Sequence, residues 1–292
     1  MRTVMKAATT STVRIPVSGG ARLMAQEFLP AGGVDTTLPT VVLAHGWTIT
    51  RHSWLPVIDE LQRHRAVRVI AYDQRGHGES TMGSDPASVR GLGDDLASVI
   101  TATVPEGPIV LGGHSMGGMS VMAYAGLHHA EFVSRVRGAA LVATAASVAG
   151  RKPIPLEGLV MGVASRAPRI APRFLVPTPI QGRLLFGEGA NPDDVKTAVG
   201  MIKRTKMPTI GAYFNAIEQH DEIEALAHFV DVPTHILVGT KDRLTPVKWA
   251  RMLQEQIPTA RLTVLPGLGH MLTYEATGTV ADALIDFIDL SA

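Results

Sequence analysis

Short, continuous apolar runs recur in the first half and again in the last quarter of the chain. A strand that is covered on both faces of a parallel sheet is apolar throughout, so these runs predict buried strands. The strands predicted in this way are 40–44, 67–72, 109–111, 138–143, 234–238 and 261–265. Two further segments, 12–17 and 22–28, predict strands that pair as a hairpin about the turn 18–20.

Amphipathic stretches with the period of a helix lie between these strands. In one of them, Leu55, Ile58 and Leu61 fall on a single face. The helices predicted from such stretches are 54–64, 86–101, 119–128, 246–257 and 271–290. Regular alternation of strand and helix predicts an α/β fold with one mostly parallel, doubly wound sheet.

The alternation stops between residues 147 and 229. This segment contains eight prolines and short amphipathic stretches, but no clear buried strand. Because the earlier pattern resumes afterwards, we predict that 147–229 is a mainly helical cap inserted over the C-terminal edge of the sheet. The core domain then consists of residues 1–146 and 230–292.

Composition narrows the class of protein further. The 292 residues include 46% hydrophobic ones, enough for a sizeable core, and a formal net charge of +1 predicts neither nucleic acid nor an anionic membrane as partner. The absence of cysteine excludes disulfides, thiolate metal sites and a cysteine nucleophile. Polar residues 9–12 interrupt the N-terminal segment, so we predict no signal peptide, no stable membrane insertion and a cytoplasmic location.

A Gly-x-Ser-x-Gly motif at 113–117 separates a predicted strand from a predicted helix. A serine at the tip of such a sharp turn has a strained backbone, and the residues two before and two after it crowd each other, so both need to be glycine. The N-terminus of the following helix favours developing negative charge. Ser115 is therefore the predicted nucleophile.

A serine hydroxyl needs a base, which is usually a histidine oriented by a carboxylate. Among the 11 histidines, His270 is the best placed, because it follows the last strand at the sheet edge where Ser115 lies. His45 and His77 lie in glycine-flanked loops, where structural hydrogen bonds account for them. His114 adjoins the serine and is expected to point away from it.

The orienting acid is expected on a loop at the same edge. Asp242 follows the predicted strand 234–238, whereas residues 142–147, which end the preceding strand, include no carboxylate. Acyl transfer also needs hydrogen-bond donors for an oxyanion. We predict the backbone N–H groups of Met116, at the helix start, and of Trp47, in the loop after strand 40–44.

These motifs together resemble the serine-dependent branch of the α/β hydrolases, which includes esterases, monoacylglycerol-lipase-like enzymes and thioesterases. The resemblance covers about 12–145 and 230–290 and follows the family order of nucleophile, acid and histidine. The segments that carry it are 45–47 (HGW), 73–80 (DQRGHGES), 113–117 (GHSMG), 239–242 (GTKD) and 267–270 (GLGH). It implies the α/β-hydrolase fold, an acyl-enzyme intermediate formed on Ser115, and no cofactor or metal.

Several activities remain open on this scaffold. The first is hydrolysis of a carboxylic ester. The same triad of Ser115, Asp242 and His270 would also support the reactions of a thioesterase, an acyltransferase, or a cofactor-free haloperoxidase or perhydrolase. A non-catalytic ligand-binding protein is the alternative outside enzymes. Serine at 115 excludes dehalogenases and epoxide hydrolases of this fold, which need aspartate there, and Trp47 disfavours lipases with a His-Gly-Gly-Gly loop.

The inserted segment is strongly apolar, which predicts a mobile lid and a small-molecule ester with a hydrophobic acyl or alcohol group. The apolar residues on which this prediction rests are Leu156, Leu159, Val160, Met161, Leu184, Leu185, Phe186, Met201, Ile202, Met207, Tyr213 and Phe214.

Overall fold

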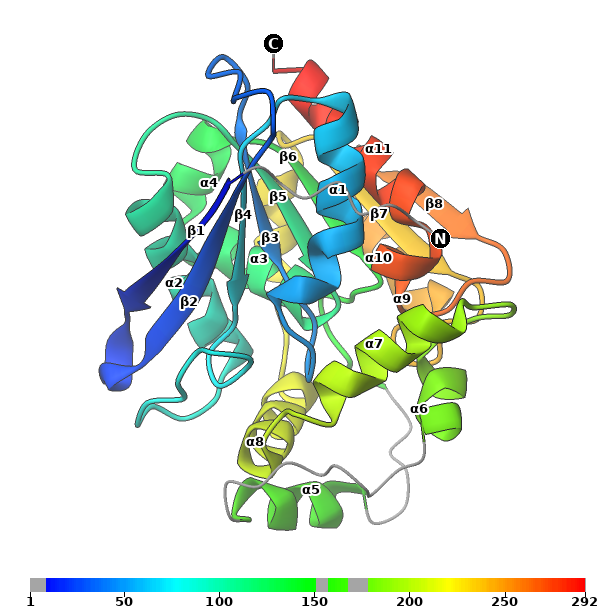
Figure 1. Ribbon diagram of the computed structural model, residues 1–292. Coiled ribbons are helices and arrows are strands. Elements are labelled where there is room, and N and C mark those ends of the chain that lie inside the picture. Colours follow the sequence, from blue (N-terminus) through cyan, green and yellow to red (C-terminus); the bar gives the residue numbers. More distant parts are fainter. Residues whose placement is uncertain (1–8, 151–156, 168–177, 292) are drawn as a thin grey trace.

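A computed structural model describes residues 9–150, 157–167 and 178–291. Eight strands form one sheet in the order β1-β2-β4-β3-β5-β6-β7-β8 (Figure 1). They are β1 (Thr9–Pro16), β2 (Arg22–Leu29), β3 (Thr40–Ala44), β4 (Val69–Asp73), β5 (Ile109–His114), β6 (Val136–Val142), β7 (Thr234–Gly239) and β8 (Arg261–Leu265). Strands β3 to β8 run parallel, whereas β2 pairs antiparallel with both β1 and β4. The predicted sheet is confirmed.

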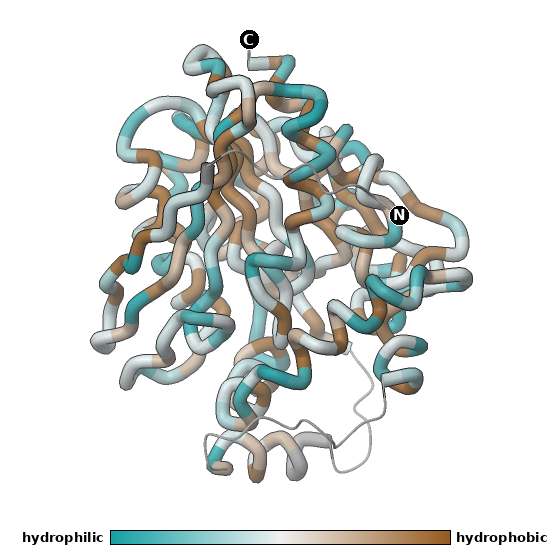
Figure 2. Tube along the Cα trace, viewed as in Figure 1, coloured by the Kyte–Doolittle hydropathy of each residue, from teal (hydrophilic) through white to brown (hydrophobic). Residues whose placement is uncertain are grey.

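Helices cover both faces of this sheet, and each face has its own core. Alternate residues of a strand face opposite sides, so in β3 Val42 packs into one core while Val41 and Leu43 pack into the other. The first face carries α2 (Val89–Thr103), α3 (Met116–Leu127), α4 (His129–Arg135) and α9 (Val247–Gln256), and the second carries α1 (Leu55–His64) and α11 (Thr277–Asp289). Figure 2 shows the central strands as hydrophobic, which fits burial on both faces.

The inserted segment lies beyond the C-terminal ends of the parallel strands (Figure 1). Its described helices are α5 (Glu157–Ser165), α6 (Thr178–Leu185), α7 (Pro192–Ile202) and α8 (Met207–Glu218). Its two ends meet at a neck, where Ser147 pairs with Asp221 and the Glu222 N–H donates to the Ala146 carbonyl at 2.9 Å. After the neck, Leu226 and Phe229 of the short 3-10 helix η3 (Glu224–Phe229) pack into the main core. The domain boundaries proposed from the sequence remain a prediction.

The predicted helices differ from the structure at their ends, and one of them is broken; the helix predicted at 86–101, for example, spans Val89–Thr103. The helix expected at 119–128 begins at Met116, immediately after the serine. The helix expected at 271–290 is broken at Ala276, whose φ of −135° and ψ of 41° are not helical, into α10 (Leu272–Glu275) and α11. Among the helices of the described residues, none combines the length and apolarity needed to cross a membrane.

Candidate active site

Ser115 occupies the strained turn that its glycines predict. Its φ is 53° and its ψ is −121°, a left-handed conformation that non-glycine residues rarely adopt. A Cβ atom added to Gly113 would lie 2.6 Å from the Gly117 carbonyl oxygen, and one added to Gly117 would clash with the Ala44 carbonyl oxygen. The crowding on both sides of the serine therefore explains both glycines of the motif.

Strand β6 and the residues that follow it hold this turn in place. The Ser115 N–H donates to the Val142 carbonyl at 2.9 Å, and the Thr144 hydroxyl donates to the Ser115 carbonyl at 2.7 Å. Thr144 also lies where a side chain on Gly118 would stand. Strained backbone persists only when its surroundings determine it, and these contacts do so here.

Asp242 and His270 form a buried hydrogen-bonded pair, with 2.8 Å between Oδ2 and Nδ1. The Asp242 carboxylate also accepts the N–H groups of Leu244 and Thr245 at 2.9 and 2.8 Å, and the Thr245 hydroxyl at 2.8 Å. Burial favours the neutral carboxyl, but the charge and hydrogen bond of His270 and the bonds from Thr245 hold the pKa of Asp242 below its usual range. An ionised Asp242 accepts the Nδ1 proton, which leaves Nε2 of His270 free to accept another.

The loops that carry Ser115 and His270 meet through His114. The His114 Nε2 donates to the His270 carbonyl at 2.9 Å, and the two imidazole rings lie 4.9 Å apart. His114 is fully buried, and burial lowers its pKa to about 3. His114 is therefore a neutral structural group that joins the two loops.

The segment 45–47 passes close to the serine. A Cβ atom on Gly46 would lie 3.1 Å from the Ser115 Cβ, so glycine allows this approach. Met116 is the first residue of α3, and the first four N–H groups of a helix have no partner within it. The Trp47 ring lies 6.1 Å from the Phe214 ring of α8, which places the indole between core and cap.

The segment 73–80 contains structural residues. Asp73 is buried and accepts the N–H groups of Arg51 and Glu79 at 2.8 and 2.9 Å, and it also pairs with the Arg51 guanidinium. His77 Nδ1 donates to the Arg75 carbonyl at 3.0 Å, and burial lowers the pKa of His77 to about 3. Sequence patterns had not indicated the buried Arg51 or its pairing.

His45 has a similar structural role. Its Nδ1 donates to the Gly46 carbonyl at 2.7 Å, and its Nε2 accepts the Gln74 N–H at 2.9 Å. Burial lowers the pKa of His45 to about 4, so this imidazole is neutral near pH 7.

Among the described residues, no group of three or more histidine, aspartate or glutamate side chains is arranged to hold a metal ion.

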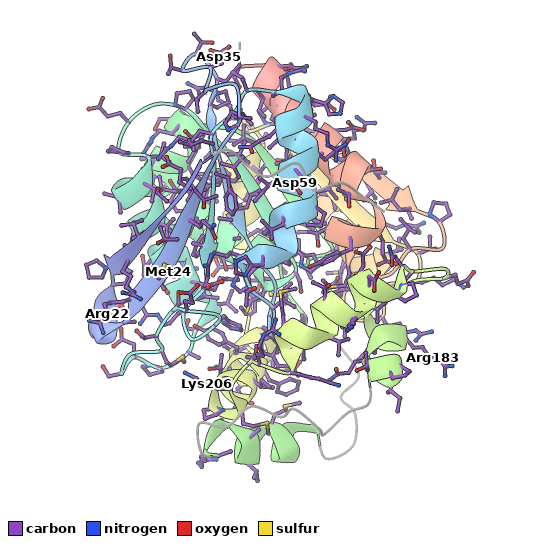
Figure 3. All side chains as sticks on the ribbon, in the orientation of Figure 1. Arg22, Met24, Asp35, Asp59, Arg183 and Lys206 are labelled. Atoms are coloured by element: carbon purple, nitrogen blue, oxygen red, sulfur yellow. The ribbon has the colours of Figure 1, made fainter. Side chains whose placement is uncertain are left out.

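The cap contacts the histidine loop directly. The His270 N–H donates to the Leu185 carbonyl of α6 at 2.7 Å, and the Glu188 N–H donates to the Gly267 carbonyl at 3.0 Å. Arg183, labelled in Figure 3, lies on α6. Its backbone carbonyl accepts a hydrogen bond from the Arg243 guanidinium at 2.5 Å. These bonds join the segment 183–188 of the insertion to the core, and the mobility of the lid stays a prediction.

A small apolar cluster continues this contact towards the loop after β3. Its buried members come from the cap, from that loop and from the residue after His270: Ile49, Leu185, Phe186, Ala198, Met201 and Met271. Between α7 and α8, where Figure 3 labels Lys206, the Thr205 hydroxyl donates to the Thr48 carbonyl at 2.8 Å. Leu156, Leu159 and Val160 of the predicted apolar set lie outside the residues whose side chains the structure describes.

The sheet, the turn at Ser115 and the inserted cap define an α/β hydrolase. A family model described as serine aminopeptidase, S33, matches residues 36–277, and the chain belongs to this family. It is a hydrolase of the α/β-hydrolase superfamily.

Relatives in this superfamily differ in activity. The chain is 27% identical over 85% of its length to a non-heme haloperoxidase of Rhodococcus erythropolis, covering 92% of that protein. It is 25% identical over 86% of its length to a pimeloyl-[acyl-carrier protein] methyl ester esterase of Yersinia enterocolitica, covering 93% of it.

Solved structures share the fold. An enol-lactonase from Burkholderia xenovorans matches with a TM-score of 0.78 at 22% identity, covering 95% of this chain and 100% of that one. An esterase from Thermogutta terrifontis matches with a TM-score of 0.75 at 23% identity, covering 96% and 99%.

Proposed function

We propose that this protein is a serine hydrolase that cleaves a small carboxylic ester through an acyl-enzyme intermediate. Ser115 is the nucleophile, His270 the base and Asp242 the acid that orients it. The observation that carries the proposal is the buried Asp242–His270 hydrogen bond of 2.8 Å at the sheet edge where Ser115 occupies its strained turn. Esterases among the relatives support the same reading.

The proposed reaction uses these three residues in two steps. His270 Nε2 takes the hydroxyl proton as Ser115 Oγ attacks the ester carbon, and the carbonyl oxygen becomes an oxyanion. The N–H groups of Met116 and Trp47 stabilise this oxyanion. When the carbon–oxygen bond breaks, His270 gives its proton to the leaving alcohol. Water then attacks the acyl-enzyme, again with His270 as base, and releases the acid and free Ser115.

The apolar cap supports an ester with a hydrophobic acyl or alcohol group. We include in the proposal that 147–229 acts as the cap of a core formed by 1–146 and 230–292, and that the protein works in the cytoplasm. The similarity to a haloperoxidase favours one second candidate, in which peroxide instead of water accepts the acyl group and forms a peracid. Both candidates share the acyl-enzyme, so they differ only in the acceptor.

Labelling with a fluorophosphonate probe tests the nucleophile. Wild type should react at Ser115, and Ser115→Ala should remain unlabelled and lose about 10⁴- to 10⁶-fold in kcat on p-nitrophenyl esters. Equal labelling of the two proteins would overturn the assignment. Parallel assays with acyl-thioesters, lactones, amino-acid amides and peroxide identify the acyl donor and acceptor.

A further inference from the structure

Glu275 binds backbone N–H groups on both sides of His270. This residue ends α10, and its Oε2 accepts the N–H groups of Gly269 and Met271 at 3.2 and 3.1 Å. Its Oε1 accepts the same Gly269 N–H at 3.0 Å and the Gly187 N–H of the cap at 2.6 Å. The Glu275 carboxylate therefore forms hydrogen bonds with both neighbours of His270 and with Gly187 of the cap, which is distant in the sequence.

The chemistry of these contacts calls for a carboxylate. All three partners are donors, and an ionised carboxylate offers acceptors on both oxygens. Hydrogen bonds to an ionised acceptor are shorter and stronger than those between neutral groups. A glutamine at the same position would keep the shape but turn an N–H₂ group towards a backbone N–H, so at least one of the hydrogen bonds to this side chain would be lost.

The remaining backbone groups of His270 are also held. Its N–H donates to the Leu185 carbonyl at 2.7 Å, and its carbonyl accepts the His114 imidazole at 2.9 Å. A Cβ atom on Gly269 would lie 2.5 Å from the Gly187 nitrogen, so glycine at 269 allows the cap segment to approach this closely. The backbone from 269 to 271 thus has contacts to α10, the cap and the end of β5.

We infer that Glu275 is a positioning residue for His270, and that it makes the cap segment 185–188 part of the support of the catalytic base. The inference rests on the proposed function. It follows that this segment stays in place during turnover and holds His270 in its hydrogen bond with Asp242. A small displacement of the imidazole slows proton transfer without removing contacts to the substrate, so Glu275 acts on kcat and leaves KM nearly unchanged.

The test uses the variant Glu275→Gln in the full-length protein, with Glu255→Gln as the matched control. Glu255 lies on α9 and is exposed, and its change removes the same charge away from the site. We expect kcat on a p-nitrophenyl ester to fall about 10- to 100-fold in Glu275→Gln, with KM within about threefold of wild type. Glu255→Gln should stay within about twofold of wild type in both constants.

A spectroscopic measurement separates positioning from a merely structural role. The proton between His270 Nδ1 and Asp242 is expected to give a low-field proton NMR signal in wild type. Glu275→Gln should shift or broaden this signal at a temperature well below its midpoint of unfolding. Glu275→Asp keeps the charge, but its side chain is one methylene too short to reach every donor. Its kcat should therefore lie between those of wild type and Glu275→Gln. If Glu275→Gln does not fold, Glu275→Asp serves as the test.

An unchanged NMR signal together with kcat within about twofold of wild type would overturn the inference, even if the variant melts earlier. Failure of the proposed function is recognised separately, because a wild type that hydrolyses no ester and is not labelled at Ser115 refutes it. The NMR measurement requires no substrate. It therefore still decides whether Glu275 positions His270.

Discussion

The His114 imidazole donates its Nε2 proton to the His270 carbonyl at 2.9 Å, so the residue before the proposed nucleophile holds the proposed base. A carbonyl oxygen can only accept, which fixes the proton of this neutral imidazole on Nε2. The bare Nδ1 faces Gly46 and has no hydrogen-bond partner in the described part of the chain. Three loops of the site therefore meet at one buried ring.

Replacing Asp242 with asparagine should preserve the fold and reduce kcat by about 10⁴-fold. The asparagine amide would favour the tautomer of His270 with its proton on Nε2, which cannot accept the serine proton. Steady-state kinetics and a thermal melt check this, with Asp282→Asn on α11, an exposed site, as the control. Activity within a few-fold of wild type at an unchanged melting temperature would mean that another carboxylate orients the histidine.

Replacing Gly117 with alanine should destabilise the protein by about 1–3 kcal/mol or more, because the new methyl group would overlap the Ala44 carbonyl oxygen. Gly91→Ala in α2 is the control: its Cβ atom would meet nothing closer than 3.7 Å, and alanine should stabilise the helix by about 0.5–1 kcal/mol. Urea unfolding measures both changes. Equal stability of the two variants would contradict the steric explanation of the motif.

Acid should destabilise the fold through its buried histidines. Burial lowers the pKa of His45 to about 4 and those of His77 and His114 to about 3, whereas in the unfolded chain each is about 6.5. Between these values the unfolded state binds more protons, so the free energy of unfolding falls as the pH drops from about 6.5 towards 4. Each histidine contributes up to about 1.4 kcal/mol per pH unit.

Urea unfolding between about pH 7 and pH 5 measures this slope. His77→Phe removes one of these buried groups and should reduce the slope by about one proton. A free energy of unfolding that does not vary over this range would show that the buried histidines can be protonated in the folded state.

If the substrate carries a hydrophobic group, kcat/KM on p-nitrophenyl esters should rise from the acetyl ester towards acyl chains of medium length. Each methylene buried in an apolar pocket contributes about 0.8 kcal/mol, or nearly a factor of four. Initial rates on esters with the same leaving group measure the trend. A flat or falling profile from about two to eight carbons would favour a small or polar substrate instead.

Local signals explain what the sequence predicted well. The strands could be predicted because a buried parallel strand is apolar throughout, and the turn at Ser115 because its sterics depend on neighbours two residues away. The start of α3 was missed because Gly117 and Gly118 are poor helix formers, yet packing against Ala44 and Thr144 requires them. The break at Ala276 has no local signal, since alanine is the best helix former.

Residues whose partners are distant in the chain could not be predicted. Arg51 and Asp73 are 22 residues apart, and Gly187 and Glu275 are 88 apart, so no periodicity or short motif links them. A glutamate five residues after the histidine was visible in the sequence, but its contact with Gly187 exists only once the cap has folded.

The shared hydrogen bonds at Leu185 and Gly187 also limit how this enzyme can be recombined with its relatives. A chimera that exchanged all of 147–229 would take from the core the carbonyl that accepts the His270 N–H. A graft that left residues 183–188 in place would change the rest of the insertion and keep that support. In this chain, the inserted segment therefore carries backbone groups that support the proposed base, and an exchange of the insertion has to preserve them.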